Sequence, residues 1–244
     1  MSAEEVLENC GHFLSSLPLG EVALQDLSQA IKLTEKPILQ LMYELGTYSG
    51  LAHNDACQRV LPILFQRSAF LLTTENQKQG VLNMQQVSSC VLTLQHLFNL
   101  SLSRAHVNES QQIHCYKLLA LVGATQQANI STQKWDLKKS MQAAKGLSGY
   151  QFEAYCSIIS SISTISTTPS NKEAHELLIQ LGHAFGILNH ITRDIQYKHD
   201  RFAQLNQANQ AQLKTWALNQ AKLIADAEVT PLSLLLPPLM KYIR

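Results

Sequence analysis

The side chains that could bind a divalent cation are few and scattered in this chain. The sequence holds six aspartates, and no two of them are one, three or four residues apart. Mg²⁺ prefers oxygen ligands, usually one or two carboxylates together with substrate phosphates, and carboxylates four residues apart share one face of a helix. Asp194 and Asp200 come nearest to such a pair, but six residues turn an α-helix by about 240°, so their side chains diverge. The sequence therefore predicts no Mg²⁺ site of paired aspartates.

Histidine offers a second route to metal binding. His183 and His190 are two helical turns apart, and Asp194 follows four residues later. Histidine with carboxylate suits Zn²⁺ or Fe²⁺ better than Mg²⁺. A catalytic zinc site needs three protein ligands, however, and neither HExxH nor ExxH spacing occurs. We expect no metal site and interpret these side chains as polar groups of a pocket or of the surface.

Composition and charge exclude several classes of protein. Of 244 residues, 45% are hydrophobic and 15% charged, and the formal net charge is +1. This near-neutrality argues against strong electrostatic attraction to nucleic acid or to an anionic membrane. The longest apolar runs, such as residues 232–240, are far shorter than the ~20 residues of a membrane span. We therefore expect no nucleic acid partner and no integral membrane segment.

The cysteines indicate a reducing compartment. They are odd in number, widely spread and without CxxC spacing, which predicts buried free thiols. Residues 1–9 contain three glutamates and no basic residue, unlike a signal peptide. We expect a cytoplasmic protein. The five thiols are those of Cys10, Cys57, Cys90, Cys115 and Cys156.

Apolar residues recur with helical spacing along most of the chain. Leu178, Leu181, Phe185 and Leu188 fall on one helical face. Residues 160–168, rich in serine and β-branched side chains, are expected to be helical because they continue the preceding register. The long segments between breaks predict one all-α domain, a bundle of long helices over residues 1–244. The expected breaks are residues 46–50, 76–80, 108–110, 146–149 and 167–171.

Residues 181–195 are the most informative segment about the family that this chain resembles. Residues 181–195, LGHAFGILNHITRDI, resemble the helix that carries the second aspartate-rich motif of the trans-polyprenyl diphosphate synthases, a family of the isoprenoid synthase superfamily. Other segments resemble that family in the order in which it has them, so the resemblance spans most of the chain and implies an isoprenoid-synthase-like helical fold. They are residues 36–39 (KPIL), 68–72 (SAFLL), 90–99 (CVLTLQHLFN), 155–159 (YCSII) and 239–244 (LMKYIR).

The metal-binding and diphosphate-binding residues of that family are replaced here. The first DDxxD corresponds to residues 72–76 (LTTEN), in which Glu75 is the sole carboxylate. The Gly-Asp of the next helix corresponds to Leu94 and Gln95. The Lys-Thr pair falls on residues 162–163. Residues 189–194 also resemble the Asn-x-x-x-Arg-Asp of squalene and phytoene synthases, but the acidic residue that should follow Asp194 is absent from residues 195–198.

The resemblance indicates which residues should line what remains of the family's substrate pocket. We expect Glu75, Gln95, Asn189 and Asp194 to line a vestigial pocket, with no residue assigned a catalytic role. Phe185, His190 and Arg193 are candidates for contact with an isoprenoid ligand. Phe185 is also interpreted as a core residue, and Arg193 is interpreted as the partner of Asp194 in a local ion pair.

Three functions are compatible with this pattern. The first is a non-catalytic or regulatory subunit of a prenyl diphosphate synthase, as a homodimer or as a heteromer with an active synthase. The second is an active but divergent prenyltransferase of allylic diphosphates, polyprenyl-synthase-like or squalene/phytoene-synthase-like, which would need Mg²⁺. The third is a metal-free protein that binds an isoprenoid or another lipid. The first function is the one the missing carboxylates favour.

Overall fold

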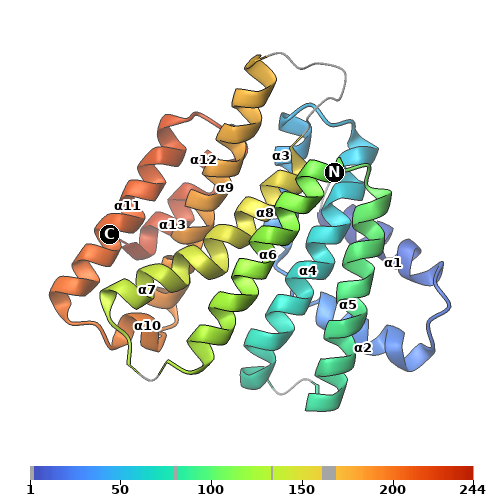
Figure 1. Ribbon diagram of the computed structural model, residues 1–244, viewed down its shortest axis with the longest axis horizontal. Helices are drawn as coiled ribbons and strands as arrows, with labels where there is room; N and C mark the ends of the chain where they lie inside the picture. The colour runs from blue at the N-terminus through green and yellow to red at the C-terminus, as the bar shows by residue number, and fades with distance from the viewer. Residues whose placement is uncertain (1–2, 80–81, 133, 161–168, 244) are drawn as a thin grey trace. The chain divides into compact units, whose positions relative to one another are not determined.

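The computed structural model describes residues 3–79, 82–132, 134–160 and 169–243, and no strand occurs among them. The all-α prediction is confirmed (Figure 1). Contacts divide the chain into two compact units, Met1–Asn108 and Glu109–Arg244. The expectation of one domain over residues 1–244 stays a prediction beside this division.

The first unit is built around the long helix α4. Its apolar residues Val60, Ile63 and Leu64 are fully buried, and α4 packs mainly against α5 and α3. Arg67 of α4 is 1% exposed and forms a bidentate ion pair with Glu35, at 2.7 and 3.1 Å. The helices of this unit are α1 (Ala3–Ser15), α2 (Glu21–Ile31), α3 (Lys36–Tyr48), α4 (His53–Gln79) and α5 (Met84–Arg104).

The second unit is organised by the helix α9, which contacts α8, η1, α11 and α13. Its buried face consists of the apolar residues predicted from their helical spacing, including Leu181, Phe185 and Leu188. The elements of this unit are α6 (Glu109–Ile130), α7 (Leu137–Ala143), η1 (Ala144–Gly149), α8 (Tyr150–Ile159), α9 (Pro169–Gln196), α10 (Asp200–Ala203), α11 (Gln207–Asp226), α12 (Thr230–Ser233) and α13 (Leu236–Ile243).

Glycines let η1 and α9 approach closely. η1 is a π-helix, so the expected break at residues 146–149 is wrong, because the backbone stays helical and only its winding changes. A Cβ added to Gly186 would lie 2.1 Å from the backbone oxygen of Ser148, and one added to Gly182 would lie 2.4 Å from Sγ of Cys156. Side chains at these two positions would force the elements apart.

Other expected boundaries also differ from the structure. α6 begins at Glu109 and α9 at Pro169, so most of the expected break at residues 108–110 and the described part of the one at 167–171 are helical. α4 continues to Gln79 through most of the expected break at residues 76–80. α8 ends at Ile159, and Ser160 has an extended conformation with ψ of 134°, so residue 160 is not helical as expected. Residues 161–168 lie outside the described part of the chain, and with them the expected Lys-Thr position at 162–163.

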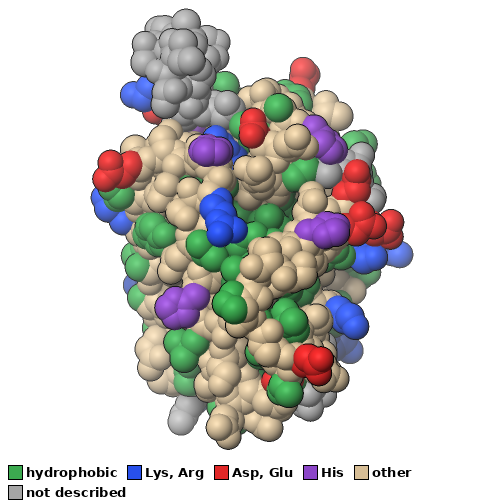
Figure 2. All heavy atoms as spheres, turned by 90° about the vertical axis from the view of Figure 1, so that its right-hand side faces the viewer, with side chains coloured by type: hydrophobic (Ala, Val, Ile, Leu, Met, Phe, Trp, Pro, Cys, Tyr) green, Lys and Arg blue, Asp and Glu red, His purple; other side chains and the backbone are tan. Residues whose placement is uncertain are grey.

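Buried thiols and an uncharged surface agree with the composition. All five cysteines are free and buried, and burial raises the pKa of Cys10, Cys115 and Cys156 to about 12. Figure 2 shows a face on which hydrophobic and neutral polar atoms predominate and charged side chains are scattered. In the described residues we find no helix whose length and apolarity would let it cross a membrane.

The contact between η1 and α9 generates a prediction about glycine. We expect Gly186→Ala to destabilise the protein by about 1 to 3 kcal/mol, because the new methyl group meets backbone that cannot move aside cheaply. Gly11→Ala is the matched control, since a Cβ at Gly11 in α1 meets nothing within 4 Å, and it should stabilise by up to about 1 kcal/mol. Urea unfolding of the three proteins measures both changes. Equal effects of the two substitutions would contradict the packing described.

Candidate functional site

Most of the predicted site residues lie on one helix, α9. Phe185, Asn189, His190, Arg193 and Asp194 all belong to it. The other two predicted site residues, Glu75 and Gln95, lie in the first unit. Gln95 is an exposed residue of α5, and position 75 is in α4, with its Glu75 side chain outside the described atoms. The convergence of Glu75 and Gln95 with Asn189 and Asp194 stays a prediction.

Asp194 is the buried centre of this region. It is 3% exposed, and both of its carboxylate oxygens accept hydrogen bonds from Arg201. Nη2 of Arg201 donates to Oδ1 at 2.7 Å, and Nε donates to Oδ2 at 2.9 Å. Such a bidentate contact is a strong and directional form of ion pair. The sequence had suggested the adjacent Arg193 as the partner, whereas the structure uses a residue from the next helix.

A helix end brings Arg201 to Asp194. α9 ends at Gln196, and Lys198 takes the left-handed conformation with φ of 51°. The amide of His199 then donates to the carbonyl of Asp194 at 3.0 Å, and that of Lys198 to the carbonyl of Ile195 at 3.3 Å. These two bonds define a Schellman motif. The chain therefore reverses directly into α10, where Arg201 faces back toward α9.

Helix α7 and the segment before it hold Arg201 from the other side. The hydroxyl of Ser140 donates to the carbonyl of Arg201 at 2.6 Å. The guanidinium lies 5.8 Å from the ring centroid of Trp135, at the distance of a cation–π contact. Arg201 is thus positioned by three contacts, of which only one is with Asp194.

His190 connects this ion pair to η1. Its Nδ1 lies 2.9 Å from the hydroxyl of Ser148, and its Nε2 lies 3.5 Å from Oδ2 of Asp194. Burial lowers the pKa of His190 to about 4, with Asp194 partly opposing the shift. Burial alone would raise the pKa of Asp194, but His190 and Arg201 outweigh it and the pKa falls below its usual value. Near neutral pH the region therefore holds a neutral imidazole beside a paired carboxylate.

Ser148, His190 and Asp194 have the residue types of a nucleophilic triad, but their arrangement does not fit that chemistry. Ser148 is 6% exposed, so a substrate would have little access to its hydroxyl. The carboxylate oxygens are held by Arg201, and a base with a pKa of about 4 is poorly matched to proton transfer at neutral pH. We interpret the three residues as a structural network.

His183 does not belong to this network. Its Nδ1 lies 2.8 Å from Oε2 of Glu153 on α8, and His114 of α6 approaches Oε1 of the same carboxylate at 3.7 Å. His183 therefore has a different carboxylate partner from His190, which lies beside Asp194. Within the described ranges, no group of three or more His, Cys, Asp or Glu side chains has a metal-binding arrangement.

Phe185 lies in an aromatic cluster of the core. It is 1% exposed, and its ring centroid is 5.2 Å from that of Phe152. Phe152 in turn contacts Tyr155 at 5.6 Å. This agrees with the interpretation of Phe185 as a core residue, and contact with an isoprenoid stays a prediction for Phe185, His190 and Arg193.

Comparison with solved structures identifies the architecture. A geranyltranstransferase from Thermotoga maritima superposes with a TM-score of 0.71 at 14% identity, over 100% of this chain and 97% of that one. An isoprenoid synthase family member from Thermotoga neapolitana gives 0.72 at 13% identity, over 98% of both chains. The chain has the isoprenoid synthase fold. No family model and no curated protein sequence matches it.

A third structure supports the isoprenoid synthase fold, which the resemblance of segments had predicted. A geranyltransferase from Legionella pneumophila gives a TM-score of 0.70 at 11% identity, over 99% of this chain and 92% of that one. Of the functions compatible with the sequence, only the divergent prenyltransferase would need Mg²⁺ at the helix of residues 181–195. The residues present there do not fit this ion, because the carboxylate of Asp194 is buried and both of its oxygens are occupied by Arg201.

The network around His190 predicts sensitivity to acid. The pKa of His190 is about 4 in the folded state and about 6.5 when unfolded, so between these values the unfolded chain binds more protons. The free energy of unfolding should therefore fall as the pH drops from 6.5 to 4, by about 3 kcal/mol from this residue.

Urea unfolding at a series of pH values from 7 to about 4 measures this loss. His190→Gln keeps a polar group near Ser148 but cannot titrate, so its stability should depend less steeply on pH than that of the unsubstituted chain. His12→Gln is the control, because His12 is exposed, and it should leave the slope unchanged. Parallel curves for all three proteins would show that His190 is not buried in its neutral form.

Proposed function

We propose that this protein is a non-catalytic subunit of a prenyl diphosphate synthase, which has kept the isoprenoid synthase fold without Mg²⁺-dependent chemistry of its own. The observation that carries the proposal is the bidentate ion pair between Asp194 and Arg201. A Mg²⁺ ion would have to replace Arg201 at this carboxylate. Breaking a buried pair by removing one partner costs about 3 to 5 kcal/mol, so the carboxylate is a poor ligand for an incoming ion.

An assay of the purified chain tests the missing activity. We expect no diphosphate release when the protein is incubated with Mg²⁺, isopentenyl diphosphate and allylic diphosphates of several chain lengths. A synthase with both aspartate-rich motifs serves as the positive control under the same conditions. Release of diphosphate that disappears in Asp194→Asn would refute the proposal and establish the divergent prenyltransferase instead.

The exposed face of α6 supports the role of a subunit. Ile113, Tyr116 and Ile130 are 46%, 42% and 76% exposed on this helix. Between Glu109 and Ile130 the helix carries only one other charged residue, Lys117. The other polar residues of the helix, such as Gln112 and Gln126, are uncharged. Apolar side chains of a helix normally face a partner surface, so an exposed face of this kind is suited to contact with another chain.

Packing against the described residues does not require a glycine at Gly123 on the same helix. A Cβ there would meet nothing within 4 Å, and a glycine within a helix costs roughly 0.5 to 1 kcal/mol relative to alanine. Close approach of a second backbone would explain the residue. If two such helices cross antiparallel near Ala120 and Gly123, Ile113 of one meets Ile130 of the other, as expected for a two-fold contact.

Substitutions on this face test the association. We expect Ala120→Glu to weaken binding to a second subunit about a hundredfold or more, because a carboxylate would be buried without a partner. Val22→Glu is the control, since Val22 is a 73% exposed residue of α2 outside this face. Sedimentation equilibrium of the chain alone, and of the chain mixed with an active synthase, gives the dissociation constants. A chain that stays monomeric in both experiments would contradict the subunit role.

A further inference from the structure

The C-terminal residues leave apolar surface uncovered. Residues 231–243 carry a single charge, that of Lys241. Of the eight residues of α13, only Ile243 is buried, and Leu234 and Tyr242 are 67% and 38% exposed. Contiguous exposed apolar surface marks a site of contact with a protein, a ligand or a membrane.

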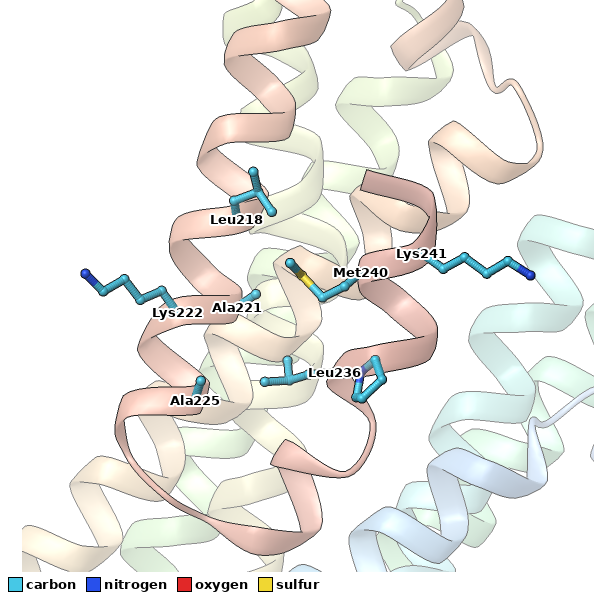
Figure 3. Close-up of a pocket in the computed structure, with 8 residues that line it drawn as sticks. Leu218, Ala221, Lys222, Ala225, Leu236, Met240 and Lys241 are labelled. Carbon is cyan, nitrogen blue, oxygen red and sulfur yellow. The ribbon is translucent and has the colours of Figure 1, made fainter. Parts of the chain in front are cut away.

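A groove between α11 and α13 continues this surface. Its volume is about 560 Å³. Figure 3 shows Leu236 and Met240 pointing from α13 toward Ala221 and Ala225 of α11, so the groove has an apolar floor. The residues that line it are Leu218, Ala221, Lys222, Ala225, Leu236, Pro237, Met240 and Lys241.

Two lysines flank the groove. The ammonium groups of Lys222 and Lys241 extend away from it on opposite sides (Figure 3), and no carboxylate is among its lining residues. Lysine stems lie along apolar surface while the charged end stays in water. The rims of the groove are therefore complementary to anionic groups placed beside an apolar phase.

We propose that this surface, the C-terminal patch, docks on the surface of a lipid bilayer that contains anionic lipid. The patch consists of Leu234, Leu236, Pro237 and Met240, with Lys222 and Lys241 at its edges. Apolar side chains on one side and lysines at the boundary are the features of helices that lie in the interface of a membrane.

A bilayer fits the patch better than a protein does. Protein interfaces form about one hydrogen bond per 100–200 Å², whereas residues 234–240 are all leucine, proline or methionine and offer no polar side chain. Pro237 and its neighbour Pro238 also lack a backbone N–H. Hydrocarbon and the glycerol region of a lipid require no such bonds.

Charged residues near the groove determine how strongly binding to a bilayer should depend on its content of anionic lipid. Asp226 and Glu228 lie one and three residues after Ala225, the last α11 residue of the groove, and are exposed. The net charge of the chain is +1. The attraction of the two lysines for lipid phosphate is therefore local. The apolar side chains provide most of the binding, and anionic lipid adds to it.

Flotation with vesicles tests the inference on the full chain. We expect binding to phosphatidylcholine vesicles that contain phosphatidylglycerol and weaker binding to pure phosphatidylcholine. Met240→Ser should weaken binding about tenfold or more, because a buried methionine side chain is lost. Lys222→Ala and Lys241→Ala should each weaken it about fivefold, only on the anionic vesicles.

Two further variants keep the test decisive. Leu234→Ser changes a residue that is already 67% exposed, so it should weaken vesicle binding without affecting folding, as circular dichroism would show. Val22→Ser, at a 73% exposed residue of α2, should bind like the unsubstituted chain. The inference is overturned if the chain binds neither vesicle, if Leu234→Ser and Val22→Ser behave alike, or if Leu234→Ser instead abolishes self-association in the absence of lipid. None of these results depends on whether the chain releases diphosphate.

Discussion

The ion pair between Asp194 and Arg201 constrains the arrangement of the second unit around the end of α9. It joins the end of α9 to α10 in a buried setting, where an unpaired carboxylate would be costly. Through His190 and Ser148 the same group of side chains reaches η1. A carboxylate committed in this way orders the protein, and it is not available as a free metal ligand.

This network depends on how closely η1 can approach α9. Gly182 and Gly186 leave no Cβ where backbone and sulfur atoms of η1 and α8 lie, so the hydroxyl of Ser148 comes within hydrogen-bonding distance of His190. π-helical segments often occur at functional sites. Here Ser148 of the π-helix lies within hydrogen-bonding distance of Nδ1 of His190, and Nε2 of the same ring lies 3.5 Å from the paired carboxylate of Asp194.

The fold and Mg²⁺ chemistry depend on different residues of such a chain. The helices superpose on isoprenoid synthases over almost their whole length, because the fold depends on apolar spacing and glycine contacts. Mg²⁺ binding depends on a few carboxylates, which the packing of the core does not require. The remaining unusual features lie on the surface, where the face of α6 and the C-terminal patch expose apolar side chains. We infer that contacts with other molecules account for both.

The sequence by itself determined the class of fold, the buried face of α9 and the scarcity of carboxylates, since helical period and residue type are local properties. The tertiary structure decided the partners. Arg201 reaches Asp194 because Lys198 adopts a left-handed conformation. Glycine is the usual residue in that conformation, so a lysine there gives no sign of it in the sequence. His183 pairs with Glu153, thirty residues away on another helix, although spacing had suggested His190. A helical pattern fixes which side chains share a face, but the residue opposite each of them depends on how the helices pack.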